Sequence, residues 1–203
     1  MAKGKLFVIS GPSGVGKGTI CKEVLNAESS LELSVSMTTR PPREGEINNV
    51  HYRFVDHEVF KGLIGENGFM EYASVYGNFY GTPKDQVFDR LERGIDVILE
   101  IDVQGAMKIK ETYQGGVFIF ILPPSIEELK NRIKKRGSET EETLARRAGA
   151  AVEEISSVGS YDYSVVNGEL QQAVKDVRTI IAAERCRIND DKALHIIERY
   201  KEE

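Results

Sequence analysis

Cysteine, histidine and long apolar runs are all scarce in this chain of 203 residues. The two cysteines, Cys21 and Cys186, stand far apart and match neither a CxxC pair nor a Cys/His metal site, which predicts reduced thiols. The three histidines, at positions 51, 57 and 195, form no metal-like group either. No apolar run approaches the length of a membrane span, and the N-terminus lacks the h-region of a signal peptide. These absences predict a cytoplasmic protein with no membrane partner.

Positively charged residues are fewer than negatively charged ones. The chain has 27 Lys and Arg residues against 32 Asp and Glu residues, so its net charge is −5. A broad surface for nucleic acid is therefore not expected, and local basic clusters should bind small anions instead. Internal repeats and low-complexity tracts are absent, and the length suits one sizeable domain with insertions.

Short apolar runs typical of buried parallel strands recur along the chain, at residues 6–10, 33–37, 96–100, 117–122 and 163–166. Amphipathic patterns typical of helices lie between most of them, at residues 18–27, 83–93, 103–112, 125–136, 141–156 and 169–187. Strands that alternate with helices predict right-handed crossovers and a parallel sheet covered on both faces. Ligands bind such folds at the carboxyl ends of the strands.

Two segments interrupt this alternation. Residues 40–82 are rich in Gly, Asn, Tyr and Phe, and pieces such as HYRFV at residues 51–55 alternate with a period of two, which predicts an inserted subdomain of short strands. Residues 134–142 carry dense charge around a glycine, between two helical patterns. We interpret this second segment as a mobile lid.

A glycine-rich loop follows the first apolar run and opens the first helical pattern, with the sequence GPSGVGKGT at residues 11–19. Backbone N–H groups of such a loop converge on phosphate oxygens, the helix N-terminus adds its dipole, and Lys17 adds a positive charge. A Walker A loop has Ser or Thr directly after its lysine, whereas here Gly18 comes before Thr19, which displaces the hydroxyl that usually serves Mg²⁺. The loop predicts a nucleotide site, and a tight turn without a ligand is the alternative.

A second basic group follows the predicted strand at residues 33–37. Arg40 and Arg43 flank a stiff diproline, and guanidinium forks bind phosphate oxygens in pairs. Tyr52 and Tyr80 can add O–H donors. These residues predict a second anion site. The alternative is that the arginines are merely solvated and the tyrosines pack a small core.

The sequence around this group resembles a known family. SVSMTTRPPREGE at residues 34–46, followed by HYRF at residues 51–54, closely resembles the motif of guanylate kinases, which transfer phosphate from ATP to GMP. The glycine loop, FMEY at 69–72, GNFYGT at 77–82, LEIDVQG at 99–105 and RGSE at 136–139 also fall in the family's order, so the resemblance covers nearly the whole chain. It implies an α/β fold: a P-loop three-layer sandwich with a central parallel sheet, an inserted mixed-strand subdomain and a helical lid.

The resemblance also divides the chain into functional parts. It implies a core formed by residues 1–35, 83–133 and 155–203, a GMP-binding subdomain at residues 36–82 and a lid at residues 134–154. ATP and Mg²⁺ are the implied cofactor set, and GMP and ATP are the implied small-molecule partners. The oligomeric state stays open, with a homo-oligomer as one option.

Individual residues take roles from the same resemblance. The implied ATP-binding residues are Gly11, Ser13, Gly14, Val15, Gly16, Lys17, Gly18, Thr19 and Asn167. The implied GMP ligands are Arg40, Arg43, Tyr52 and Tyr80 at the phosphate, Ser36, Glu71 and Thr82 at the guanine, and Asp102 elsewhere in the GMP site. Lys17, Arg132, Arg136 and Arg147 are implied to approach the transferring phosphoryl group. Glu100 is implied to hold Mg²⁺ through water.

The chemistry of these residues supports some roles and leaves alternatives for others. Guanine presents N1–H and an exocyclic amine side by side, which one carboxylate such as that of Glu71 can accept, whereas adenine has an acceptor at N1. A surface ion pair is the alternative for Glu71, and capping of the helix near residue 103 is the alternative for Glu100 and Asp102. Asn167 precedes a glycine, so it also suits a tight turn. We expect Cys21 to be a packing residue.

Two rival functions are weighed against a guanylate kinase. Guanylate-kinase-like modules of scaffold proteins keep the fold and bind protein ligands, but they typically have an eroded phosphate loop, whereas Lys17 is kept here. A kinase for another nucleoside monophosphate is the second rival, because Gly18-Thr19 after the lysine also occurs in adenylate kinases. The implied guanine contacts, Ser36, Glu71 and Thr82, favour GMP.

Overall fold

The computed structural model describes residues 3–75, 77–135, 141–188 and 190–201. Five parallel strands form the central sheet in the order β2-β7-β1-β8-β9. Their bounds are Leu6–Ser10 for β1, Leu31–Leu33 for β2, Asp96–Glu100 for β7, Gly116–Leu122 for β8 and Tyr163–Val166 for β9. The predicted strands at residues 6–10, 96–100 and 163–166 are therefore confirmed, and β8 begins one residue before its predicted start.

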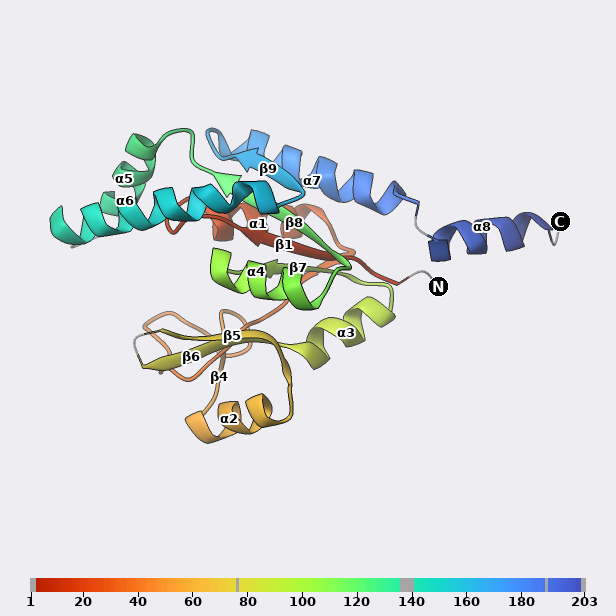
Figure 1. Ribbon diagram of the computed structural model, residues 1–203, viewed down its shortest axis with the longest axis horizontal. Coiled ribbons are helices and arrows are strands. Elements are labelled where there is room, and N and C mark those ends of the chain that lie inside the picture. The colour runs from red at the N-terminus through yellow and green to blue at the C-terminus, as the bar shows by residue number, and fades with distance from the viewer. Residues whose placement is uncertain (1–2, 76, 136–140, 189, 202–203) are drawn as a thin grey trace.

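Helices cover both faces of this sheet, as the alternation of strands and helices predicts (Figure 1). One face packs against α1 (Lys17–Ala27), α5 (Ile126–Lys135), α6 (Glu141–Ile155) and α7 (Leu170–Cys186). The other face packs against α3 (Lys84–Glu92) and α4 (Val103–Thr112). Side chains of β1 alternate between the two cores, with Phe7 and Ile9 on the first side and Leu6 and Val8 on the second. Cys21 is buried in the first core, which confirms its predicted packing role.

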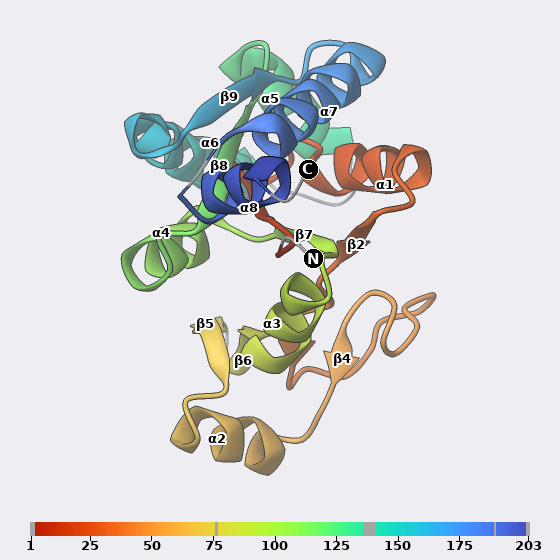
Figure 2. The same ribbon diagram turned by 90° about the vertical axis from the view of Figure 1, so that its right-hand side faces the viewer.

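A second sheet of four strands lies beside the core and is mixed, in the order β4-β3-β6-β5 (Figure 2). Its strands are Met37–Thr38 (β3), Arg53–Phe54 (β4), Phe69–Val75 (β5) and Asn78–Pro83 (β6). The prediction of one strand at residues 33–37 is wrong, because β2 ends at Leu33 and β3 begins at Met37 in the other sheet. Ser34 still donates its backbone N–H to the Ile98 carbonyl at 2.9 Å, and the chain then leaves the central sheet.

Two helices were not among the predicted elements. Helix α2 (His57–Gly65) packs on the second sheet through Phe60, whose ring stacks on Phe69 with 4.3 Å between centroids. Helix α8 (Asp190–Lys201) projects away from the rest of the chain in Figure 1. Within the described residues, no helix combines the length and the apolar character that crossing a membrane requires.

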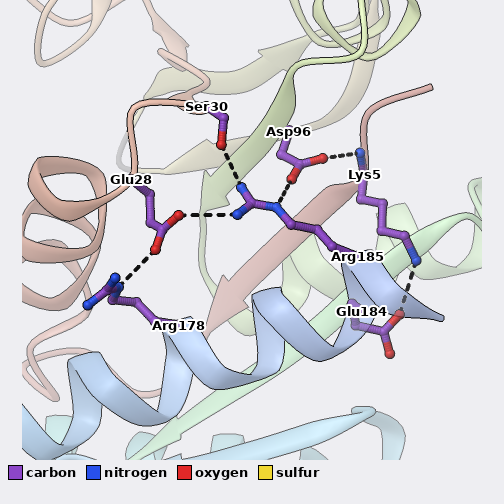
Figure 3. Close-up of polar contacts among 7 residues, drawn as sticks. All are labelled: Lys5, Glu28, Ser30, Asp96, Arg178, Glu184 and Arg185. Atoms are coloured by element: carbon purple, nitrogen blue, oxygen red, sulfur yellow. Dashed lines mark hydrogen bonds and ion pairs between the residues drawn. The ribbon is translucent and has the colours of Figure 1, made fainter. Parts of the chain in front are cut away.

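A network of charged side chains fastens α7 at the end of the sheet opposite the carboxyl ends of the strands (Figure 3). Arg185 donates from Nε to Asp96 Oδ2 at 2.7 Å, and its two other nitrogens reach Glu28 Oε2 at 3.1 Å and Ser30 Oγ at 3.0 Å. Hydrogen bonds from Arg178 and Arg185 lower the pKa of the Glu28 carboxyl. Asp96 also accepts from the backbone N–H of Lys5 at 2.7 Å. The network therefore joins α7 to the starts of β1 and β7 and to the end of α1.

We expect Arg185→Ala to lower the free energy of unfolding by about 1–2 kcal/mol, between the values typical of exposed and buried ion pairs. Arg178→Ala is the matched control, because Arg178 lies on the same helix and donates to Glu28 alone among the contacts of Figure 3. Arg178→Ala should lower the free energy of unfolding by less than about 0.5 kcal/mol. Denaturant unfolding of both variants measures the difference. Equal losses in the free energy of unfolding would show that the contacts of Arg185 with Asp96 and Ser30 add nothing to stability.

Candidate active site

The glycine-rich loop between β1 and α1 has the backbone that a phosphate cradle requires. Gly11, Gly14 and Gly16 have φ values of 142°, 87° and 100°, which L side chains rarely adopt. Space is also short, because a Cβ on Gly11 would lie 2.3 Å from the Ile121 carbonyl oxygen. The conformation of this loop therefore requires glycine at these positions. The N–H groups of the loop lie at the N-terminus of α1.

Lys17 folds back over this loop. Its Nζ donates to the carbonyl oxygens of Gly11, at 2.6 Å, and Pro12, at 3.3 Å. Burial lowers the pKa of the Lys17 ammonium, and the carboxylates of Glu100, Glu154 and Asp102 act in the opposite direction. The ammonium is therefore held at the loop by carbonyls and neighbouring negative charge.

A cavity of about 240 Å³ lies over the loop. Six loop residues line it, and three acidic residues complete the wall: Gly11, Ser13, Gly14, Gly16, Lys17 and Gly18, with Glu100, Asp102 and Glu154. The structure thus brings together most of the predicted ATP-binding residues. The cavity lies at the carboxyl ends of β1 and β7, which is where ligands are expected to bind in this fold.

The remaining predicted ATP-binding residues lie around this cavity and do not line it. Val15 is buried, and its carbonyl accepts from Asn167 Nδ2 at 2.8 Å. Asn167 is itself buried, and a Cβ on Gly16 would lie 2.5 Å from its Nδ2. Thr19 is exposed on α1. Asn167 therefore supports the loop, and its contact with adenine stays a prediction.

Two of the three predicted lid arginines reach the loop. Arg147, on α6, donates from a terminal nitrogen to Ser13 Oγ at 2.8 Å. Arg132, on α5, pairs with Glu128 at 2.9 Å and donates to the Val15 carbonyl at 3.4 Å. Arg136 lies outside the described residues. Arg147 and Arg132 therefore bring positive charge to the glycine-rich loop.

Arg40, Tyr52 and Tyr80 of the predicted second anion site lie together, and Glu46 lies among them. Arg40 makes a two-pronged pair with the Glu46 carboxylate, at 2.5 and 2.7 Å, and the Arg43 N–H donates to the same group at 2.7 Å. These contacts lower the pKa of Glu46 to about 2. The Arg40 guanidinium lies 5.1 Å from the Tyr52 ring centroid, and Tyr52 meets Tyr80 edge to face. Sequence reasoning gave Glu46 no role, although it lies three residues after Arg43 in the quoted motif.

A second cavity, of about 320 Å³, opens beside these residues. Its walls include the predicted GMP ligands Ser36, Tyr52, Glu71, Tyr80 and Asp102. It shares Lys17, Glu100 and Asp102 with the first cavity. Burial raises the pKa of Glu71. Thr82 is fully buried behind it and donates from Oγ1 to Glu71 Oε1 at 2.9 Å. Thr82 thus orients Glu71, and its own contact with guanine stays a prediction.

The two acidic residues at the end of β7 differ in role. Asp102 caps α4, because its Oδ1 accepts the Gly105 N–H at 2.7 Å, which confirms the capping alternative. Glu100 faces the loop, since a Cβ on Gly18 would lie 3.3 Å from both of its carboxylate oxygens. Within the described residues, no group of three His, Cys, Asp or Glu side chains could hold a metal unaided. The pair still suits Mg²⁺, which proteins commonly bind through one or two carboxylates together with substrate phosphates.

Glu154 is a second residue that sequence reasoning missed. It lies near the end of α6 and lines the first cavity beside Ser13 and Lys17. Burial raises the pKa of its carboxyl, while Lys17 and the Ser13 N–H counteract that effect. The helical pattern predicted at residues 141–156 does not indicate that the last turn of this helix reaches the glycine-rich loop.

Comparison with known proteins identifies the family. The family model described as guanylate kinase matches residues 3–184. A guanylate kinase of Clostridium tetani is 58% identical over 189 residues, covering 93% of this chain and 90% of that protein. One of Caldanaerobacter subterraneus is 54% identical over 194 residues, covering 96% and 94%. The crystal structure of guanylate kinase from Anaplasma phagocytophilum has a TM-score of 0.75 at 35% identity, covering 92% of this chain and 88% of that one. The chain belongs to the guanylate kinase family.

Proposed function

We propose that the protein transfers the terminal phosphoryl group of ATP to GMP, forming ADP and GDP. The observation that carries this proposal is the meeting of two cavities at Lys17, one over the phosphate loop and the other beside Arg40 and Glu71. Two nucleotides bound in these cavities would have their phosphates converge at Lys17. The matched family and the relatives named guanylate kinase support the same reaction.

In this proposal the first cavity holds ATP. The loop N–H groups bind its phosphates, and Lys17 and Arg147 supply positive charge near the group in transfer. Phosphoryl transfer spreads charge over the equatorial oxygens, so positioning and fixed positive charge do most of the catalytic work. Mg²⁺, held by the ATP phosphates with Glu100 and Asp102, would neutralise part of the phosphate charge.

The second cavity holds GMP. Arg40, oriented by Glu46, binds the phosphate with Arg43 and the tyrosines, while Glu71, oriented by Thr82, accepts from the guanine. We propose residues 36–82, which contain all of the second sheet except Pro83, as the GMP-binding subdomain. We propose residues 134–154 as a lid that excludes water during transfer. An open site would let water accept the phosphoryl group.

Turnover with GMP and with AMP at saturating MgATP tests the proposal. We expect GMP to be preferred on the order of 10⁴-fold in kcat/KM, because AMP has no N1–H and no C2 amine to donate to the Glu71 carboxylate, which would lose the partners that guanine supplies. Thermal shifts with GMP, AMP and UMP give an independent readout of acceptor binding. Equal turnover of GMP and AMP would favour a kinase of broader acceptor range, and no turnover would favour a binding module.

A further inference from the structure

Glu71 is held between two elements, strand β6 and helix α4. On one side, Thr82 of β6 donates to Oε1 at 2.9 Å. On the other side lies the first turn of α4, where a Cβ on Gly105 would be 3.1 Å from Glu71 Oε2. The carboxylate therefore occupies the space next to the Cα of Gly105.

Backbone conformation gives no reason for glycine at this position. Gly105 lies in the first turn of α4, is buried, and has no positive φ. Glycine is a poor helix former, so an alanine would be favoured here if the space allowed it. The absence of a side chain is what the surroundings require.

Asp102 and helix α4 cannot easily move away from Gly105. The same Cβ would lie 3.3 Å from Asp102 Oδ1, which already accepts the Gly105 N–H at 2.7 Å. One turn later, Lys108 Nζ donates to the Tyr72 carbonyl at 2.8 Å and ties α4 to β5, the strand that carries Glu71. A methyl group at position 105 would therefore push the Glu71 carboxylate rather than the helix.

We propose that Gly105 is a specificity-determining residue of the acceptor site. By leaving room for the Glu71 carboxylate against α4, it sets the position from which that group meets N1–H and the exocyclic amine of guanine. The inference rests on the proposed function, because it assumes that GMP binds the second cavity with its base at Glu71.

The substitution Gly105→Ala tests this role, with Gly62→Ala as the matched control. Gly62 is also a helical glycine, on α2, but a Cβ there would meet nothing within 4 Å. For Gly105→Ala we expect the KM for GMP to rise about tenfold, less than the 10²-fold typical of a 1 Å misplacement. The KM for IMP, which lacks the exocyclic amine, should rise less. The KM for MgATP, kcat and the unfolding midpoint should stay near those of Gly62→Ala.

A second pair of variants asks whether the effect passes through Glu71. In a Glu71→Asp background the shorter side chain withdraws from position 105, so adding Gly105→Ala should raise the KM for GMP by less than it does in the wild type. An equal rise in both backgrounds, a rise for MgATP as large as for GMP, or a Gly105→Ala protein that does not fold would overturn the inference. A wild-type protein that does not turn over GMP would instead contradict the proposed function.

Discussion

Lys17→Ala should reduce kcat on the order of 10³-fold, a loss of about 4 kcal/mol in transition-state stabilisation. Lys17 lines both cavities, and the Gly11 and Pro12 carbonyls hold its ammonium at the loop. A charge fixed in advance needs no reorganisation when negative charge develops on the phosphoryl oxygens. The KM for GMP should change little, because the proposal assigns the binding of that substrate to Arg40 and Glu71. Steady-state kinetics with MgATP and GMP varied in turn measures both effects.

Lys22→Ala is the control for this variant. Lys22 lies on the same helix, α1, but is exposed to solvent, so its removal should leave kcat within about twofold of the wild type. Lys17→Arg adds a second comparison, since it keeps the charge but spreads it over a planar fork. A Lys17→Ala enzyme that keeps wild-type kcat while folding normally would remove this residue from the catalytic machinery.

Much of the fold could be predicted because the strands of the central sheet are short, apolar and separated by helical patterns. Strands buried on both faces carry that signal in every residue, and β7 was predicted residue for residue. The wrong prediction at residues 33–37 arose because this run was interpreted as one buried strand like the others. Only pairing partners reveal that Leu33 hydrogen-bonds within one sheet and Met37 within the other, and pairing is not visible in a single sequence.

The candidate site divides in the same way. Residues that act through their own chemistry, such as Lys17 and Arg40, stand in recognisable motifs. Residues that act by placing another side chain are harder to assign even inside a motif, because their role depends on a partner that the fold supplies. Glu46 places Arg40, and Thr82 places Glu71. Glu154 reaches the loop only because α6 runs across the core and ends beside Ser13.

Glu71→Gln should weaken the preference of the acceptor site for guanine. The Glu71 carboxylate offers two acceptor atoms, which suits N1–H and the exocyclic amine of guanine, whereas an amide offers one acceptor and one donor, so its NH₂ group opposes one of the two guanine donors. Losing one hydrogen bond to a charged group and opposing a donor with a donor should lower kcat/KM for GMP on the order of 10²- to 10³-fold. The ratio of kcat/KM for AMP to kcat/KM for GMP should therefore rise. Thr82 Oγ1 can still donate to the amide oxygen, so the side chain keeps its orientation.

The ratio of kcat/KM for GMP to that for AMP, measured at saturating MgATP, reports this change directly. Glu66→Gln, an exposed site in the same subdomain, is the matched control and should leave the ratio unchanged. Since Lys17 and Arg147 are untouched, kcat at saturating GMP should fall much less than kcat/KM, which separates base recognition from phosphoryl transfer. If the variant retained the full wild-type ratio, the base would not be read at Glu71, and both the acceptor assignment and the inference about Gly105 would have to be abandoned.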